Sequence, residues 1–100
     1  MNEKGDRMAR RQRLMTAEEV RALVNAALAD PTVNLAAPLM FSLMSRESLR
    51  LENLSGISRG DYHPAVDDVR GSLTYRDGDW LRAVTLSQES ELLLAAYLDR

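Results

Sequence analysis

Arg50 is the residue of this sequence best suited to phosphate chemistry. It stands in LRLENLSGISRGDY, residues 49–62, where apolar residues recur at helical spacing after a candidate N-cap, Ser48. A guanidinium binds a phosphate through two parallel hydrogen bonds and stabilises negative charge on its oxygens. The start of a helix adds backbone N–H groups that face the same anion. The pattern therefore predicts an anion-binding arginine, and the alternative is a surface arginine paired with Glu47 or Glu52.

A basic arm precedes the rest of the chain. Residues 1–14 hold five basic and two acidic residues, while residues 15–100 sum to −5 and bring the net charge to −2. Such an arm either contacts nucleic acid or is a solvated, frayed terminus. Residues 1–15 lack core-forming periodicity, so we predict a disordered arm there and a single domain over residues 16–100. The candidate DNA-binding residues are Arg7, Arg10, Arg11, Arg13, Arg46 and Arg76.

The composition excludes several kinds of site. The chain has no cysteine, which rules out disulfides, thiol catalysis and cysteine-based zinc sites. The single histidine, His63, cannot build a histidine cluster, and Asp61, Asp67 and Asp68 lack the glycine and glutamate spacing of a calcium loop. We therefore expect neither a metal nor another cofactor. No apolar run approaches the ~20 residues that span a bilayer, and no secretory signal is present, so we expect a cytoplasmic protein without a membrane partner.

Three helices are predicted before residue 60. Thr16 and Glu19 have the spacing of a capping box at the start of the first helix, and Asp30 followed by proline ends it. The second spans about residues 33–44 and must hold Pro38 in its first turn or bend there. The third spans about residues 49–58. The apolar face predicted for the first helix consists of Val20, Leu23, Val24, Ala27 and Leu28.

A β-hairpin and a final helix follow. Asp77-Gly78 between two β-prone runs predicts a two-residue type I′ turn that pairs Tyr75 with Trp80. Ser87 caps a helix over residues 88–98, which is apolar on most sides and therefore belongs in the core or at an interface. This order of three helices, a hairpin and a C-terminal helix predicts an α+β fold with a small antiparallel sheet.

In this order the motifs resemble the first half of the catalytic domain of the tyrosine recombinase (phage integrase) family, over about residues 14–100. The family opens a helix with Leu-Thr-x-Glu-Glu, and LMTAEEVRALVNAAL is similar. The family's third helix begins with an arginine in the pattern Arg-Ile-Ser-Glu-Leu-x-x-Leu-x-x-x-Asp-Ile. In this chain Arg50 is followed by Leu54 at +4 and Asp61 at +11. A family hairpin ends in Arg-x-Val-Pro-Leu before a helix with Tyr-Leu, and LRAVTLSQESELLLAAYLDR is similar, with Arg82 in register.

The resemblance implies that Arg50 grips the scissile phosphate of DNA. Arg76 would stand near DNA in place of a hairpin lysine that this chain lacks, and its alternative is a cross-strand pair with Asp79. The family's His-x-x-Arg motif and nucleophilic tyrosine have no counterpart here, and Tyr97 lies in the wrong helix for that role. We therefore expect a recombinase fragment or remnant that does not catalyse recombination alone and binds the DNA backbone weakly and salt-sensitively.

A second hypothesis is a protein-interaction or regulatory module. Its apolar helix, residues 88–98, would dock on a partner protein or on a second copy of the chain. An unrelated small enzyme is disfavoured, because no convergent set of titratable residues is visible. The recombinase hypothesis requires Arg50 to face an anion beside the hairpin; a side chain that points inward or is locked to a carboxylate, or a missing hairpin, would overturn it.

Overall fold

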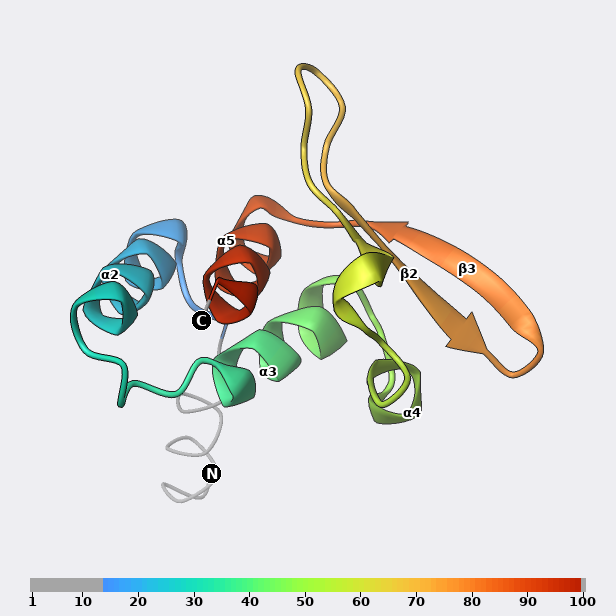
Figure 1. Cartoon of the computed structure of the whole chain (residues 1–100), viewed down its shortest axis with the longest axis horizontal. Coiled ribbons are helices and arrows are strands. Elements are labelled where there is room, and N and C mark those ends of the chain that lie inside the picture. The colour runs from blue at the N-terminus through green and yellow to red at the C-terminus, as the bar shows by residue number, and fades with distance from the viewer. Residues whose placement is uncertain (1–13, 100) are drawn as a thin grey trace, which may run out of the picture.

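The computed structural model describes residues 14–99, which form helices packed beside a small antiparallel sheet (Figure 1). The helices are α2 (Ala17–Ala29), α3 (Ala36–Arg46), α4 (Leu51–Leu54) and α5 (Gln88–Leu98), with a 3-10 helix at Arg59–Asp61. The strands are β1 (Tyr62–His63), β2 (Ser72–Asp77) and β3 (Trp80–Thr85), in the spatial order β1-β2-β3. The predicted α+β class is confirmed. Most of the predicted arm, with Arg7, Arg10, Arg11 and Arg13, lies outside the described residues.

Helix α2 begins as its sequence predicts. Thr16 Oγ1 accepts a hydrogen bond from the Glu19 N–H at 3.2 Å, and the Glu19 carboxylate accepts one from the Thr16 N–H at 2.9 Å. Val20 and Ala27 are buried, but Leu28, predicted on the same face, is 66% exposed. Eight residues advance a helix about 80° past two full turns. Leu28 is therefore rotated away from the stripe that Val20 starts.

Helix α3 begins three residues later than predicted. The Asn34 side chain accepts a hydrogen bond from the Ala36 N–H at 2.8 Å, and this local bond holds the chain outside the helix until Leu35. Pro38 is the third helical residue and lies in the first turn, as expected, where a missing N–H costs no intrahelical bond.

Helix α4 is much shorter than the predicted 49–58 helix. Ser48 has a φ of 60° and is not the N-cap of this helix. The N-cap is Arg50, whose backbone N–H donates to Asn53 Oδ1 at 2.8 Å. At the other end, the Ser55 hydroxyl donates to the carbonyl of Glu52 at 2.9 Å. Serine side chains compete in this way for backbone groups, and the following glycine has a poor helix propensity. The helix therefore stops after a single turn.

The hairpin pairs its strands two residues away from the predicted register. Asp77 lies opposite Trp80, so the turn consists of Gly78 and Asp79. Of these two, only Gly78 has a positive φ, of 62°, as in a type II′ turn rather than type I′. The predicted register would have placed an arginine opposite Leu73, which is fully buried; the observed one places Val84 there. The two-residue shift leaves each side chain on the same face of the ribbon, but it brings an apolar residue rather than an arginine opposite the buried Leu73.

The core lies where α5 packs against α2 and α3, with β2 beside it. The prediction that the last helix is central is confirmed, since Leu93 is fully buried. Two buried hydroxyls, Ser42 and Ser90, share a hydrogen bond of 2.6 Å between α3 and α5. The Glu47 carboxylate accepts bonds from the Ser90 hydroxyl and from the Ser87 N–H, the latter at 2.8 Å. This polar link is satisfied and joins the end of α3 to the start of α5.

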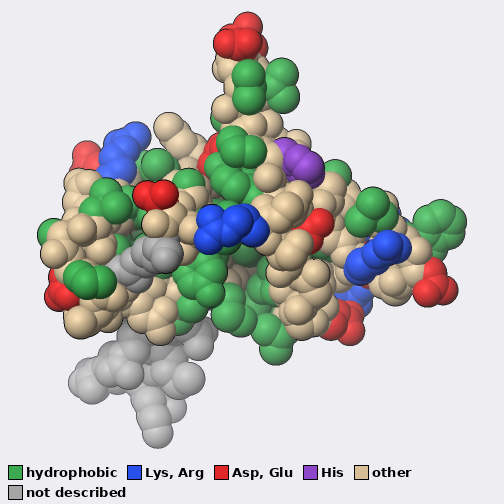
Figure 2. All heavy atoms as spheres, in the orientation of Figure 1, with side chains coloured by type: hydrophobic (Ala, Val, Ile, Leu, Met, Phe, Trp, Pro, Cys, Tyr) green, Lys and Arg blue, Asp and Glu red, His purple; other side chains and the backbone are tan. Residues whose placement is uncertain are grey.

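A narrow loop between β1 and β2 projects away from the rest of the molecule (Figure 1). Val66 and Val69 pair with each other across it, and its tip is acidic (Figure 2). Among the helices of residues 14–99, none is long and apolar enough to cross a bilayer.

Candidate functional site

Arg50 lies at the start of a short helix beside the hairpin, but as the N-cap of that helix and not, as predicted, one or two residues after a cap at Ser48. The buried Asn53 side chain makes this junction: its Oδ1 accepts from the Arg50 N–H, and its Nδ2 donates to the carbonyl of Arg76 in β2 at 3.0 Å. Residue 53 thus ties α4 to the hairpin, and Arg50 is held close to the hairpin tip.

Two carboxylates hold the Arg50 guanidinium. Arg50 Nη2 lies 3.0 Å from Asp77 Oδ1, and Arg50 Nε lies 3.3 Å from Glu52 Oε1. Asp77 also accepts a bond from Arg82 Nε at 2.9 Å. The ion pair with Glu52 was one predicted alternative, and it counts against a guanidinium that is unpaired and free to bind phosphate. The Arg50 side chain is nevertheless 66% exposed, and such surface pairs contribute less than about 1 kcal/mol, so an anion can compete for it.

Arg46, one of the candidate DNA-binding residues, faces inward and is not on an open surface. Its Nη1 lies 3.5 Å from Glu89 Oε2, and its Nη2 donates to the carbonyl of Met15. Only 19% of the Arg46 side chain is exposed. The guanidinium joins α3 to α5 and to the segment before α2, because a fork of N–H donors can serve several acceptors at once.

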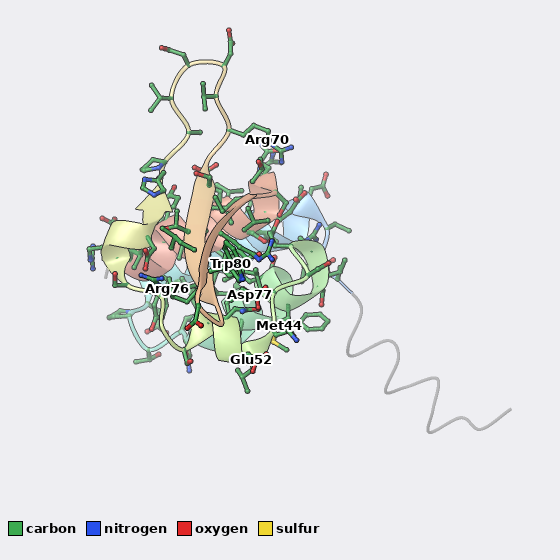
Figure 3. The ribbon with its side chains drawn as sticks, turned by 90° about the vertical axis from the view of Figure 1, so that its right-hand side faces the viewer. Met44, Glu52, Arg70, Arg76, Asp77 and Trp80 are labelled. Atoms are coloured by element: carbon green, nitrogen blue, oxygen red, sulfur yellow. The ribbon has the colours of Figure 1, made fainter. Side chains whose placement is uncertain are left out.

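Arg76 is exposed on β2 but does not pair with Asp79. The register places Arg76 opposite Leu81 and moves Asp79 into the turn. Successive strand residues point to opposite faces, so the Arg76 side chain lies on the other face of the ribbon from Asp77, the partner of Arg50 (Figure 3). The candidate DNA-binding arginines of the described region are therefore not gathered on one surface.

The loop carboxylates are not arranged as a ligand set. Residues 14–99 contain no group of three or more His, Asp or Glu side chains placed to hold a metal ion. Asp61 is engaged within the fold, because it accepts bonds from the Ser58 N–H and from the Thr74 hydroxyl, each at 2.8 Å. These two bonds, the Ser58 one first, lower the pKa of Asp61.

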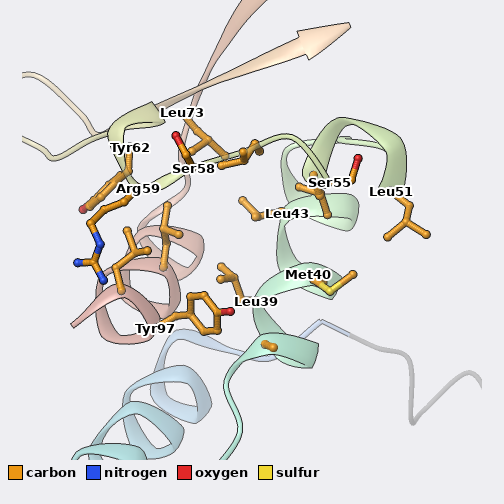
Figure 4. A pocket seen from close by; sticks show the side chains of 15 residues that line it. Leu39, Met40, Leu43, Leu51, Ser55, Ser58, Arg59, Tyr62, Leu73 and Tyr97 are labelled. Carbon is orange, nitrogen blue, oxygen red and sulfur yellow. The ribbon is translucent and has the colours of Figure 1, made fainter. Parts of the chain in front are cut away.

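An apolar cleft of about 440 Å³ opens between α3, α4 and α5 (Figure 4). That volume is within the range of ligand pockets, roughly 300–1,000 Å³. Among the residues that line it, Arg59 is the only charged one. Its apolar lining comes from several elements and consists of Ala36, Leu39, Met40, Leu43, Leu51, Leu54, Ile57, Tyr62, Leu73, Leu94, Tyr97 and Leu98.

Sequence reasoning missed this cleft, because it predicted a longer third helix. Leu51, Leu54 and Ile57 would then share one packed face, but the helix ends at Leu54 and leaves Leu51 exposed. The apolar helix over residues 88–98 also differs from the expected docking surface. Most of its apolar residues are used in the chain's own core, and it offers the cleft one edge that includes the exposed Tyr97.

Tyr62, in the cleft wall, makes stability sensitive to alkaline pH. Burial, together with a 2.9 Å bond from its hydroxyl to Glu91 Oε2, raises the pKa of Tyr62 to about 12. An unfolded tyrosine loses its proton near pH ~10. Because the folded state binds this proton more tightly, the contribution to stability is complete below pH ~10 and is lost as the pH rises to about 12. Denaturant unfolding over this pH range measures the loss, and Tyr62→Phe should remove the Tyr62 part of it; an unchanged pH profile in Tyr62→Phe would contradict the assignment.

The comparisons do not assign the chain to a family: no protein-family model, no curated protein and no solved structure matches it.

Proposed function

We propose that this chain binds the DNA backbone weakly through Arg50, as part of a tyrosine-recombinase-like domain. The observation that supports this function best is the position of Arg50, an exposed guanidinium at the start of α4 and beside the β2–β3 hairpin. The order of helices and strands agrees with the same resemblance. The family's His-x-x-Arg motif is not found in these 100 residues, so we propose binding and not DNA cleavage.

Binding of a phosphate requires exchange of ion-pair partners. A phosphate oxygen would replace Asp77 Oδ1 on Arg50 Nη2, and the freed carboxylate would keep its bond to Arg82. The exchange costs little, because the pair is exposed to solvent. The charge of −5 on residues 15–100 opposes the approach of DNA, so we expect micromolar or weaker affinity that falls further as salt rises.

The test compares removal of the arginine with removal of its competitor. Arg50→Ala should weaken binding to duplex DNA roughly 3- to 10-fold, because one phosphate contact is lost. Asp77→Asn should instead strengthen binding by a similar factor, roughly 3- to 10-fold, because Arg50 is released. Fluorescence anisotropy of a labelled duplex at low salt, followed by a salt titration, measures both effects.

Asp79→Asn is the matched control for this experiment. It removes the same charge from the same hairpin, but Asp79 makes no described bond to an arginine. Its gain in affinity therefore reports net charge alone, and Asp77→Asn must exceed it. Equal gains for the two variants, or binding that high salt leaves undiminished, would refute the role of Arg50.

A further inference from the structure

The hairpin tip exposes two large apolar side chains. Trp80, labelled in Figure 3, is 71% exposed and Leu81 is 63% exposed, and both are at the start of β3, next to the hairpin turn. The two side chains do not form one patch, so the candidate contact depends on Trp80 at an interface with another molecule. Tryptophan is the side chain most enriched at the energetic centres of such interfaces. The tip is therefore one half of a candidate contact.

The cleft between α3, α4 and α5 has the complementary properties. Its rim residues Met40, Leu51 and Tyr97 are all exposed, so an incoming side chain reaches the apolar lining without displacing the core. Arg59 at this rim is exposed and makes no described ion pair within residues 14–99. A site of this kind accepts an apolar group that has a carboxylate next to it.

We infer that the hairpin tip of one copy of this chain docks in the cleft of a second copy. Trp80 enters the apolar lining, and Asp79, the exposed turn residue that precedes it, faces Arg59. Charge complementarity supports this occupant, because Asp79 likewise has no described ion pair among residues 14–99. The tip does not reach the cleft of its own chain, because Arg50 and Asn53 bond Asp77 and the carbonyl of Arg76 and hold the end of the hairpin beside α4.

This contact is head-to-tail. Each copy uses its tip on one neighbour and its cleft on another, so association does not stop at a dimer unless the geometry closes a ring. A single hairpin tip buries less than the ~1,200 Å² of a stable interface, and the association is therefore weak. We expect the average mass to rise steadily with protein concentration, at about 0.1–1 mM protein, without DNA present.

A mixing experiment tests the head-to-tail arrangement directly. Trp80→Ser removes the tip but keeps the cleft, and Met40→Glu places a charge in the cleft but keeps the tip. Each variant alone should be monomeric by sedimentation velocity, and an equimolar mixture should form a 1:1 dimer that grows no further. Trp80 is the single tryptophan of the chain and is absent from Trp80→Ser, so the tryptophan fluorescence of the mixture comes only from the tip of the Met40→Glu variant. Its emission should shift to the blue when that tip docks.

Charge reversal at the rim provides a second measurement that keeps the core intact. Arg59→Asp should weaken self-association at least about tenfold, and adding Asp79→Arg to the same chain should restore it. Circular dichroism verifies that every variant is folded. A wild-type chain that stays monomeric at these concentrations would overturn the inference. Variants that still self-associate alone, a mixture that stays monomeric, or failure of Asp79→Arg to restore binding would overturn it as well.

Discussion

Leu93→Ala is expected to lower the free energy of unfolding by about 3–5 kcal/mol. Leu93 is fully buried on α5, the helix that packs against both α2 and α3, so its removal leaves a cavity between three helices. A domain of this size has a total stability of about 5–15 kcal/mol, and the variant would lose a large part of it. Urea denaturation followed by circular dichroism measures the difference.

Leu28→Ala is the matched control, because it makes the same chemical change on a neighbouring helix. Leu28 is 66% exposed on α2 and fills no space in the core. Its truncation should change the free energy of unfolding by less than about 0.5 kcal/mol. Similar losses for both variants would show that α5 does not form the centre of the core.

Gly71→Ala is expected to cost about 1–3 kcal/mol, a large effect for the addition of one methyl group. An ideal Cβ at residue 71 would lie 2.3 Å from Glu91 Oε2. That oxygen accepts bonds from the Tyr62 hydroxyl and from the Ala65 N–H, each at 2.9 Å. The Glu91 side chain must move to relieve the overlap, and it then loses both bonds, which hold β1 and the projecting loop against α5. Thermal and urea denaturation measure the cost.

A double-mutant cycle separates this clash from a backbone effect at residue 71. In a Glu91→Ala background the carboxylate is absent, so Gly71→Ala should change stability by less than about 0.5 kcal/mol. If Gly71→Ala costs the same in both backgrounds, the contact with Glu91 is not the reason for the glycine.

The starts of α2 and α5 and the order of helices and hairpin could be predicted because their causes are local. The capping box of Thr16 and Glu19, the N-cap at Ser87 and the place of Pro38 each depend on residues within three or four positions. The candidate site was harder. The sequence suggested Glu47 or Glu52 as partners of Arg50, but Glu47 bonds to the start of α5, and the second partner is Asp77, which is 27 residues away.

By itself, the sequence determined the α+β class, the order of the elements and the caps that start α2 and α5, because hydrogen bonds and apolar periodicity act within one or two helical turns. Only the tertiary structure decided the hairpin register, the inward direction of Arg46 and the opening of the apolar cleft. Each of these depends on which segments meet across the core. The observed register pairs the buried Leu73 with Val84, a contact between strands that the turn residues alone do not specify, and the early end of α4 separates side chains that a longer helix would have packed together.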